Sequence, residues 1–141
     1  MFENSIAMAT LAASDQERAR RFWKDVFGLD PVRGDMGGDF YVIGGVGVLV
    51  YESQFAGTNK ATAFSIMTDD LDRDMAALRA KGVAFHEYDL PGIKTENGVV
   101  DMDGERGAWF DDSEGNIIAL AQPTSMSMDE ARAMLTGMRL N

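Results

Sequence analysis

The sequence predicts an α+β fold of two βαβββ modules followed by a C-terminal helix. One helix-like segment opens near Asp15 and ends at Gly28, and a second opens near Asp69 and ends at Gly82, 54 residues later at both points. Each segment follows a short apolar run and precedes further strand-like runs. A repeat of this length in one small chain is typical of two similar structural modules. We expect one domain over residues 1–125, with modules at about 5–53 and 61–122, and a C-terminal helix within 126–141.

The first module opens with the apolar run Ser5–Ala13. Ser14 or Asp15 is the expected helix N-cap, and Ser14 precedes Glu17 by three residues, which is the spacing of a capping box. Gly28 suits the left-handed residue that ends a helix. The apolar face between these points consists of Ala19, Phe22, Trp23, Val26 and Phe27.

Glycine-rich turns divide the rest of this module into strands. The segment Gly34–Asp39 predicts a hairpin turn, and Gly44-Gly45 predicts a tight hairpin between strands Phe40–Ile43 and Gly47–Tyr51. Residues 53–60 have the composition of a linker between the modules.

The second module repeats the plan with a longer connection. We expect a strand at Thr62–Thr68, a helix capped by Asp69 or Asp70, a strand at Val83–Tyr88 and a final hairpin. The segment Asp89–Gly104 has no strand pattern, and loops of this length often act as lids or binding loops. The remaining expected features are a buried helix stripe of Leu71, Met75, Ala76 and Leu78, hairpin strands at Ala108–Phe110 and Ile117–Gln122, and a turn at Asp112–Asn116.

The last segment predicts a short amphipathic helix. Ser127 is its expected N-cap, with Glu130 at the third helical position. This helix should pack on the domain or on a partner subunit through Ala131, Met134, Leu135 and Met138.

Composition excludes several classes of function. The net charge of −10 disfavours nucleic acid and anionic membranes as partners, and it favours a cationic ligand. Cysteine is absent, which excludes disulfides and thiolate chemistry and fits a reducing compartment. No apolar run approaches the roughly 20 residues of a membrane span, and the first residues lack a secretory signal pattern. We therefore expect a cytoplasmic protein.

Two segments carry a family resemblance. Asp15–Leu29 (DQERARRFWKDVFGL) resembles a helix that ends F-Y-x-x-V-L-G-L, and Asp111–Ile118 (DDSEGNII) resembles a D-P-x-G-N-x-x-E-L hairpin. Both patterns belong to the vicinal oxygen chelate superfamily, which includes glyoxalase I, extradiol dioxygenases, fosfomycin-resistance enzymes and bleomycin-resistance proteins. The resemblance covers about residues 6–122. It implies the glyoxalase/bleomycin-resistance fold, a homodimer, and ligand clefts between the sheets of the modules.

The resemblance also implies where a metal chelate would lie. Metal enzymes of the superfamily carry His, Gln or Glu at four inward positions, which fall here at Met8, Leu49, Ala63 and Ala119. Hard divalent cations need oxygen or imidazole ligands, and none of these four side chains supplies one. We therefore expect no metal and no cofactor. Glu52 lies three residues beyond Leu49, so strand alternation turns it to the opposite face.

Alternation along the strands predicts a mainly apolar cleft with aromatic walls. Aromatic side chains there would stack on planar or cationic ligands, although ordinary core or interface packing is the alternative for each. The candidates for a general base are His86, Glu52 or a tyrosine, and the alternative for His86 is an edge position with a solvent-facing ring. The predicted ligand-binding residues are Met8, Thr10, Tyr41, Leu49, Tyr51, Ala63, Ser65, Met67, Trp109, Ala119 and Ala121.

These observations favour a metal-free protein that sequesters a small, partly apolar ligand. One alternative is an enzyme of the superfamily, such as a lyase, isomerase or dioxygenase-like protein, acting without the usual metal. Another is a non-catalytic interaction module that docks through its C-terminal helix. The expected partners are a small molecule and a second copy of the chain.

Overall fold

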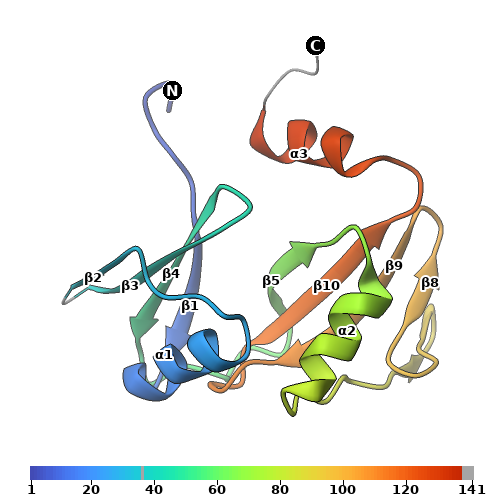
Figure 1. Cartoon of the computed structure of the whole chain (residues 1–141), viewed down its shortest axis with the longest axis horizontal. Helices are drawn as coiled ribbons and strands as arrows, with labels where there is room; N and C mark the ends of the chain where they lie inside the picture. Colours follow the sequence, from blue (N-terminus) through green and yellow to red (C-terminus); the bar gives the residue numbers. More distant parts are fainter. Residues whose placement is uncertain (36, 138–141) are drawn as a thin grey trace. The chain divides into compact units, whose positions relative to one another are not determined.

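The computed structural model describes residues 1–35 and 37–137, which form two compact units. Among the described residues, the first unit comprises 1–35 and 37–64 with 111–117, and the second comprises 65–110 with 118–137. Two four-stranded sheets have the orders β1-β4-β3-β2 and β5-β10-β9-β8, so the first strand of each lies beside the last (Figure 1). The same strand order in both sheets confirms the predicted pair of βαβββ modules.

The first sheet consists of β1 (Ala9–Ala13), β2 (Arg33–Asp35), β3 (Gly38–Ile43) and β4 (Val46–Glu52). Its central strand β4 pairs in parallel with β1 and antiparallel with β3. In this register Leu49 lies between Thr10 and Phe40. Gly44 and Gly45 have φ angles of 57° and 85°, which a type I′ turn requires, so the predicted tight hairpin is confirmed.

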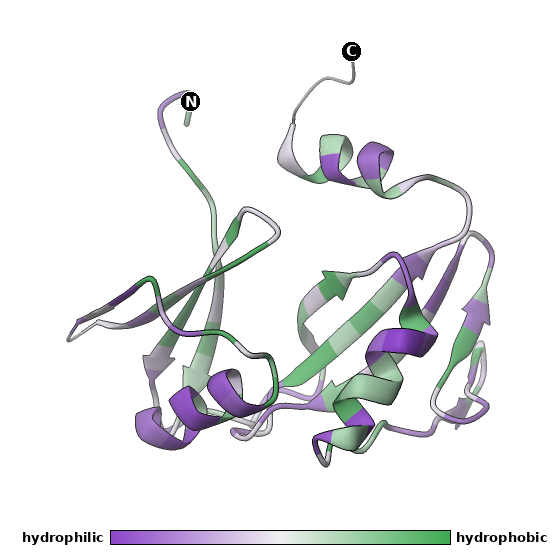
Figure 2. Ribbon diagram, in the orientation of Figure 1, coloured by the Kyte–Doolittle hydropathy of each residue, from purple (hydrophilic) through white to green (hydrophobic). Residues whose placement is uncertain are grey.

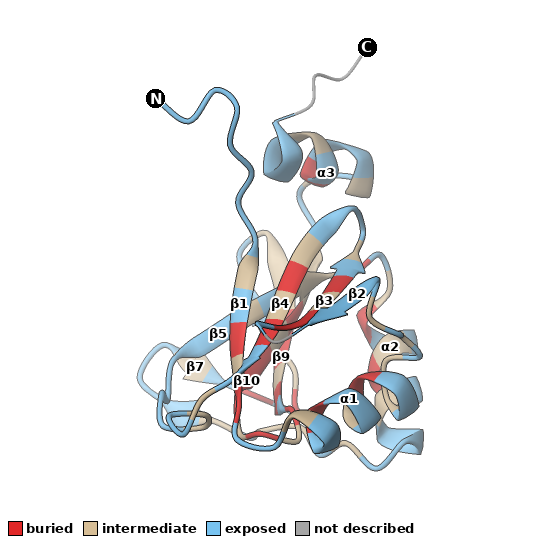
Figure 3. Cartoon of the chain, turned by 90° about the vertical axis from the view of Figure 1, so that its left-hand side faces the viewer, coloured by how far each residue is buried: buried red, intermediate tan, exposed pale blue. Residues whose placement is uncertain are grey.

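Helix α1 (Gln16–Asp25) packs on one face of this sheet through a small aromatic core. Asp15 is its N-cap and accepts a hydrogen bond from the Arg18 N–H, whereas the Ser14 hydroxyl contacts Glu114 instead. Trp23 stacks on Tyr41 of β3 with ring centroids 4.3 Å apart. The buried residues of β1, β3, β4 and α1 are visible in Figure 3, and the hydrophilic residues of α1 in Figure 2.

The second sheet consists of β5 (Thr62–Met67), β8 (Val100–Met102), β9 (Glu105–Asp111) and β10 (Ile117–Pro123). Helix α2 (Leu71–Ala80) is capped by Asp70, one residue later than the 54-residue repeat predicts. The Gln122 side chain of β10 fixes this start, because its Oε1 accepts a hydrogen bond from the Leu71 N–H at 2.9 Å.

Two predictions in the connection between α2 and β8 are wrong. Instead of a strand at Val83–Tyr88, only an isolated bridge joins Phe85 to Phe110 of β9. The segment predicted as irregular contains a short hairpin of β6 (Asp89–Leu90) and β7 (Ile93–Lys94). The backbone polar groups of Tyr88 find their hydrogen-bond partners in Thr95 rather than in a neighbouring strand. The Thr95 hydroxyl accepts a hydrogen bond from the Tyr88 N–H, and the Thr95 N–H donates one to the Tyr88 carbonyl. Because these groups are already hydrogen-bonded, the pairing with β9 does not extend from Phe85 into a full strand.

Helix α3 (Met128–Thr136) begins as predicted, because the Ser127 hydroxyl accepts the Glu130 N–H at 3.1 Å. Of its predicted apolar face, Ala131 is buried, whereas Met134 and Leu135 are exposed. Met138, the fourth predicted member, lies outside the described residues. None of the helices within residues 1–35 and 37–137 has the length and apolarity needed to cross a membrane.

Candidate functional site

In the first unit, the sheet face opposite α1 is lined mainly by apolar side chains. Val48 and Val50 of β4 are buried on the α1 side, so Leu49 and Tyr51 face the other way. Thr10 lies beside Leu49 and is exposed, as is Met8 just before β1. Four of the predicted ligand-binding residues therefore share one face: Met8, Thr10, Leu49 and Tyr51.

Tyr41 does not belong to this face, which corrects the sequence prediction. It pairs with the buried Val48, is 1% exposed and stacks on Trp23. Burial raises the pKa of Tyr41 to about 12. The error arose because Phe40–Ile43 is apolar throughout, so the run does not reveal which residues face the helix. Phe40, which lies opposite Leu49, is the aromatic residue that the prediction missed.

Glu52 also lies away from this face. It follows the alternation of Val48 and Val50 and pairs with Ala13 at the exposed end of β4. As a general base for a ligand beside Leu49 and Tyr51 it is therefore wrongly placed.

The second unit has a corresponding face opposite α2. Thr68 follows β5, is buried and donates its hydroxyl hydrogen bond to Asp74 of α2, so alternation turns Ser65 and Met67 to the other side. On β9 and β10, Phe110 and Leu120 are buried, and their neighbours face away from them. The predicted residues on this face are Ser65, Met67, Trp109, Ala119 and Ala121, and Ala63 shares their alternation at the start of β5, in the part of that strand that belongs to the first unit.

An aromatic cluster of His86, Tyr88 and Trp109 forms the most distinctive part of this face. The rings of Tyr88 and Trp109 meet edge to face, with centroids 5.4 Å apart, and His86 stacks on Tyr88 at 5.7 Å. The Tyr88 hydroxyl lies 3.2 Å from His86 Nδ1, and the His86 backbone N–H bonds to the Trp109 carbonyl at 2.8 Å. We call these three residues the aromatic cluster.

The structure supplies the partner that sequence analysis did not find for His86. The ring is half-buried and bonded to Tyr88, which differs from a solvent-facing edge histidine. The sequence feature that could have predicted this contact is the two-residue spacing of His86 and Tyr88, because it places both side chains on one side of an extended segment. Chemically, the cluster offers aromatic faces for stacking and a polar pair that can donate or accept hydrogen bonds.

Glu114 and Asp39, two of the buried carboxylates of the first unit, hold this unit together through arginines of α1. Glu114 accepts hydrogen bonds from the Asp15 N–H and from the Arg18 guanidinium at 2.7 and 3.0 Å. Although burial acts to raise its pKa, the Arg18 hydrogen bonds and charge hold the pKa of Glu114 at about 2. Asp39 of β3 accepts two hydrogen bonds from Arg20 of α1 at 3.0 and 3.2 Å. Both carboxylates serve folding rather than a ligand.

The doubled βαβββ topology and the D-D-S-E-G-N turn correspond to a known group of proteins. The sequence profile of the Glyoxalase/Bleomycin resistance protein/Dioxygenase superfamily matches residues 5–120. The chain belongs to this superfamily. A comparison with curated proteins finds no match.

Solved structures of the superfamily share the fold at low sequence identity. The fosfomycin resistance protein FosX from Listeria monocytogenes, complexed with Mn(II) and sulfate, superposes with a TM-score of 0.66 at 15% identity, covering 96% of this chain and 99% of that one. Lactoylglutathione lyase from Agrobacterium tumefaciens gives 0.59 at 21% identity, covering 84% and 92%. TnmS3, an antibiotic binding protein from Streptomyces sp. CB03234, gives 0.57 at 26% identity, covering 84% and 97%.

The four residues that the family resemblance assigns to the metal positions do not fit a hard divalent cation. Leu49, Ala63 and Ala119 have no ligand atom, and Met8 offers a soft thioether that does not suit manganese. Across residues 1–35 and 37–137, no three or more His, Asp or Glu side chains are arranged to hold a metal ion.

Proposed function

We propose that this member of the superfamily binds a planar, partly apolar small molecule without a metal ion and without making or breaking a covalent bond. The observation that carries the proposal is the aromatic cluster on the sheet face that also holds Ala119. The resemblance assigns Ala119 to a position where metal enzymes of the superfamily carry a ligand, and its methyl group lies on the same sheet face as the aromatic cluster.

The composition of both sheet faces supports a binding role. In the second unit, Ala119, Ala121 and Ser65 have small side chains, and Trp109 and Tyr88 provide flat contact area. The corresponding face of the first unit, taken by itself, is apolar as well, with Met8 and Leu49 on it. The similarity to TnmS3, itself an antibiotic binding protein, is consistent with this role.

Charge favours a cationic ligand over an anionic one. The chain carries a net charge of −10, which raises the local concentration of cations at its surface. Aromatic rings also attract cations through their faces. A delocalised aromatic cation would be attracted both by the negative net charge and by the ring faces of the aromatic cluster.

Fluorescence titration tests the proposal, because the two tryptophans occupy contrasting environments. Trp109 is half-buried in the aromatic cluster, and Trp23 is 1% exposed in the core of the first unit. The probes are N-methylquinolinium, naphthalene and naphthalenesulfonate, which share two fused rings and differ in charge. We expect saturable quenching that is strongest with the cation and unchanged by Mn²⁺.

Two matched variants, one for each tryptophan, show which tryptophan is quenched by the bound probe. Trp109→Phe should abolish the quenching, and Trp23→Phe should retain it, with thermal melts confirming that both variants fold. Loss of one stacking contact should weaken binding by roughly fivefold or more when measured by calorimetry. Quenching that survives Trp109→Phe, or binding that requires Mn²⁺, would refute the proposal.

The His86–Tyr88 hydrogen bond favours one second candidate, an enzyme in which this pair moves a proton. Mass spectrometry of each bound probe after long incubation would reveal conversion. Loss of conversion in both His86→Gln and Tyr88→Phe, with binding retained, would favour the enzyme, whereas unchanged probes favour the binding protein.

A homodimer remains the expected assembly. Native mass spectrometry of the purified protein measures it directly, and a monomer at micromolar concentration would contradict it.

A further inference from the structure

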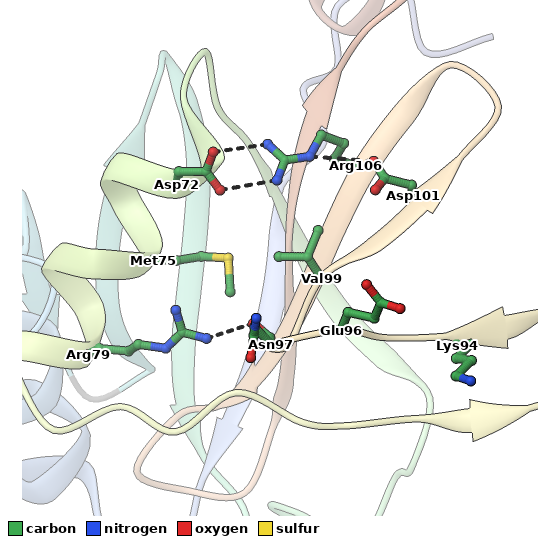
Figure 4. Close-up of a pocket in the computed structure, with 9 residues that line it drawn as sticks. All are labelled: Asp72, Met75, Arg79, Lys94, Glu96, Asn97, Val99, Asp101 and Arg106. Carbon is green, nitrogen blue, oxygen red and sulfur yellow. Dashed lines mark hydrogen bonds and ion pairs between the residues drawn. The ribbon is translucent and has the colours of Figure 1, made fainter.

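A cavity lies in the second unit, on the α2 side of its sheet and so opposite the aromatic cluster. It has a volume of about 580 Å³ and runs between α2 and the segment from β7 to β9 (Figure 4). Asp72, Met75 and Arg79 line it from α2, and their spacing of three and four residues places them on one helix face. Asn97, Val99 and Asp101 lie across from them, and Arg106 of β9 lies at one end.

The two ends of this groove carry opposite net charge. At one end Arg106 lies between two carboxylates, at 3.1 Å from Asp72 and 3.5 Å from Asp101, so the end has one negative charge in excess. At the other end Arg79 donates to the Asn97 carbonyl at 2.8 Å and lies over the Phe85 ring at 5.1 Å. Within residues 1–35 and 37–137, no carboxylate pairs with Arg79, so this end is positive.

The middle of the groove is apolar. The thioether of Met75 and the side chain of Val99 extend toward each other between the two charged ends (Figure 4). Lys94 and Glu96 also line the groove and offset each other in formal charge. The lining therefore runs from negative through apolar to positive.

A tight turn builds the wall that faces α2. Glu96 and Val99 exchange backbone hydrogen bonds of 2.8 and 3.0 Å around Asn97 and Gly98, whose φ angles are 52° and 80°. A Cβ on Gly98 would lie 2.9 Å from the Phe85 Cβ and 3.3 Å from Arg79 Nη2. Glycine at this position lets the turn approach α2 and present the Asn97 carbonyl to Arg79.

The length of the groove sets the size of its ligand. Asp72 and Arg79 are seven residues apart on α2, which corresponds to about 10 Å along the helix axis. An extended peptide advances about 3.3–3.6 Å per residue, so three residues span the same distance. A cavity of this volume falls within the usual range for small-molecule sites, roughly 300–1,000 Å³.

We propose that this groove binds a short zwitterionic peptide of about three residues. Its ammonium group lies at Asp72 and Asp101, its carboxylate at Arg79, and an apolar central side chain on Met75 and Val99. The proposal goes beyond the one for the aromatic cluster and does not depend on it, because the two sites use opposite sides of the sheet and different residues.

Calorimetry with the tripeptide Ala-Leu-Ala tests the proposal, using its N-acetylated and C-amidated forms as controls that leave the protein unchanged. We expect one site per chain, with each cap weakening binding by roughly tenfold or more. Amide chemical shifts measured by NMR should change in α2 and residues 94–106, and not around Trp109.

Paired variants assign each end of the peptide. Arg79→Gln should weaken binding of the free peptide but not of the amidated one, and Asp101→Asn should weaken binding of the free peptide but not of the acetylated one. Arg33→Gln removes an exposed arginine of the first unit and should change neither. Three results would each overturn the proposal: no binding at millimolar peptide, equal binding of all three forms, or shift changes confined to the aromatic cluster.

Discussion

Replacing Glu114 with glutamine should lower the free energy of unfolding by about 3 kcal/mol at pH 7. The Glu114 side chain is 1% exposed and bonded to Arg18 and to the Asp15 N–H. Its pKa falls from an ordinary 4.5 to about 2 in the folded protein, and each pKa unit is worth about 1.36 kcal/mol. Glutamine keeps the shape of the side chain and removes the charge, so the substitution isolates this contribution.

The same difference should depend on pH with a definite sign. Because the folded pKa is lower than the unfolded one, the stabilisation is complete above about pH 4.5 and is lost as pH falls toward 2. Asp112 contributes with the opposite sign, since burial raises its pKa and its stabilisation is lost as pH rises. Comparing wild type with Glu114→Gln cancels the Asp112 effect.

Urea denaturation at several values between pH 2 and pH 7 measures this difference. Glu17→Gln is the matched control, because Glu17 is exposed on α1 and the substitution should have little effect at any pH. A double-mutant cycle with Arg18→Gln should recover most of the loss as coupling energy. A loss below about 0.5 kcal/mol at pH 7, or one that stays constant with pH, would refute the assigned ion pair.

Three further substitutions test the first unit, each by urea denaturation. Tyr41→Phe should leave stability unchanged or raise it by up to about 1 kcal/mol, because the buried Tyr41 hydroxyl has no hydrogen-bond partner among the described residues; a clear loss would mean that the hydroxyl has one. Gly38→Ala should cost more than about 2 kcal/mol, because φ is 131° and the added Cβ would lie 2.3 Å from the Val50 carbonyl oxygen; tolerance would place this strand differently. Asp39→Asn should cost about 2 kcal/mol by weakening the two bonds from Arg20, and an unchanged midpoint would show that the pair does not stabilise the fold.

Local sequence signals predicted the framework of the fold well. Asp15, Gly28 and Ser127 act at helix ends in the structure much as their types suggest, because capping depends on a few neighbouring residues. The Gly44-Gly45 hairpin follows for the same reason, since a type I′ turn needs two positive φ angles.

Strand phase was harder to predict where apolar residues run together. The predicted facing of Leu49 came from the family resemblance and that of Tyr51 from its equal parity along the strand, and both residues do face away from the buried Val48 and Val50. The facing of Tyr41 was predicted wrongly, because no polar residue within Phe40–Ile43 marks the outer face of the strand. Its cross-strand pairing with the buried Val48 sets its side chain on the α1 side.

The sequence by itself determined the doubled βαβββ plan, the acidic net charge and the lack of oxygen or imidazole ligands at Met8, Leu49, Ala63 and Ala119, since each depends on residue type and spacing. Only the tertiary structure decided that Tyr88 joins His86 and Trp109, that Glu114 pairs with Arg18, and that a charged groove lies beside α2. These contacts join residues far apart in the chain or set the direction of a side chain, and no local pattern specifies either.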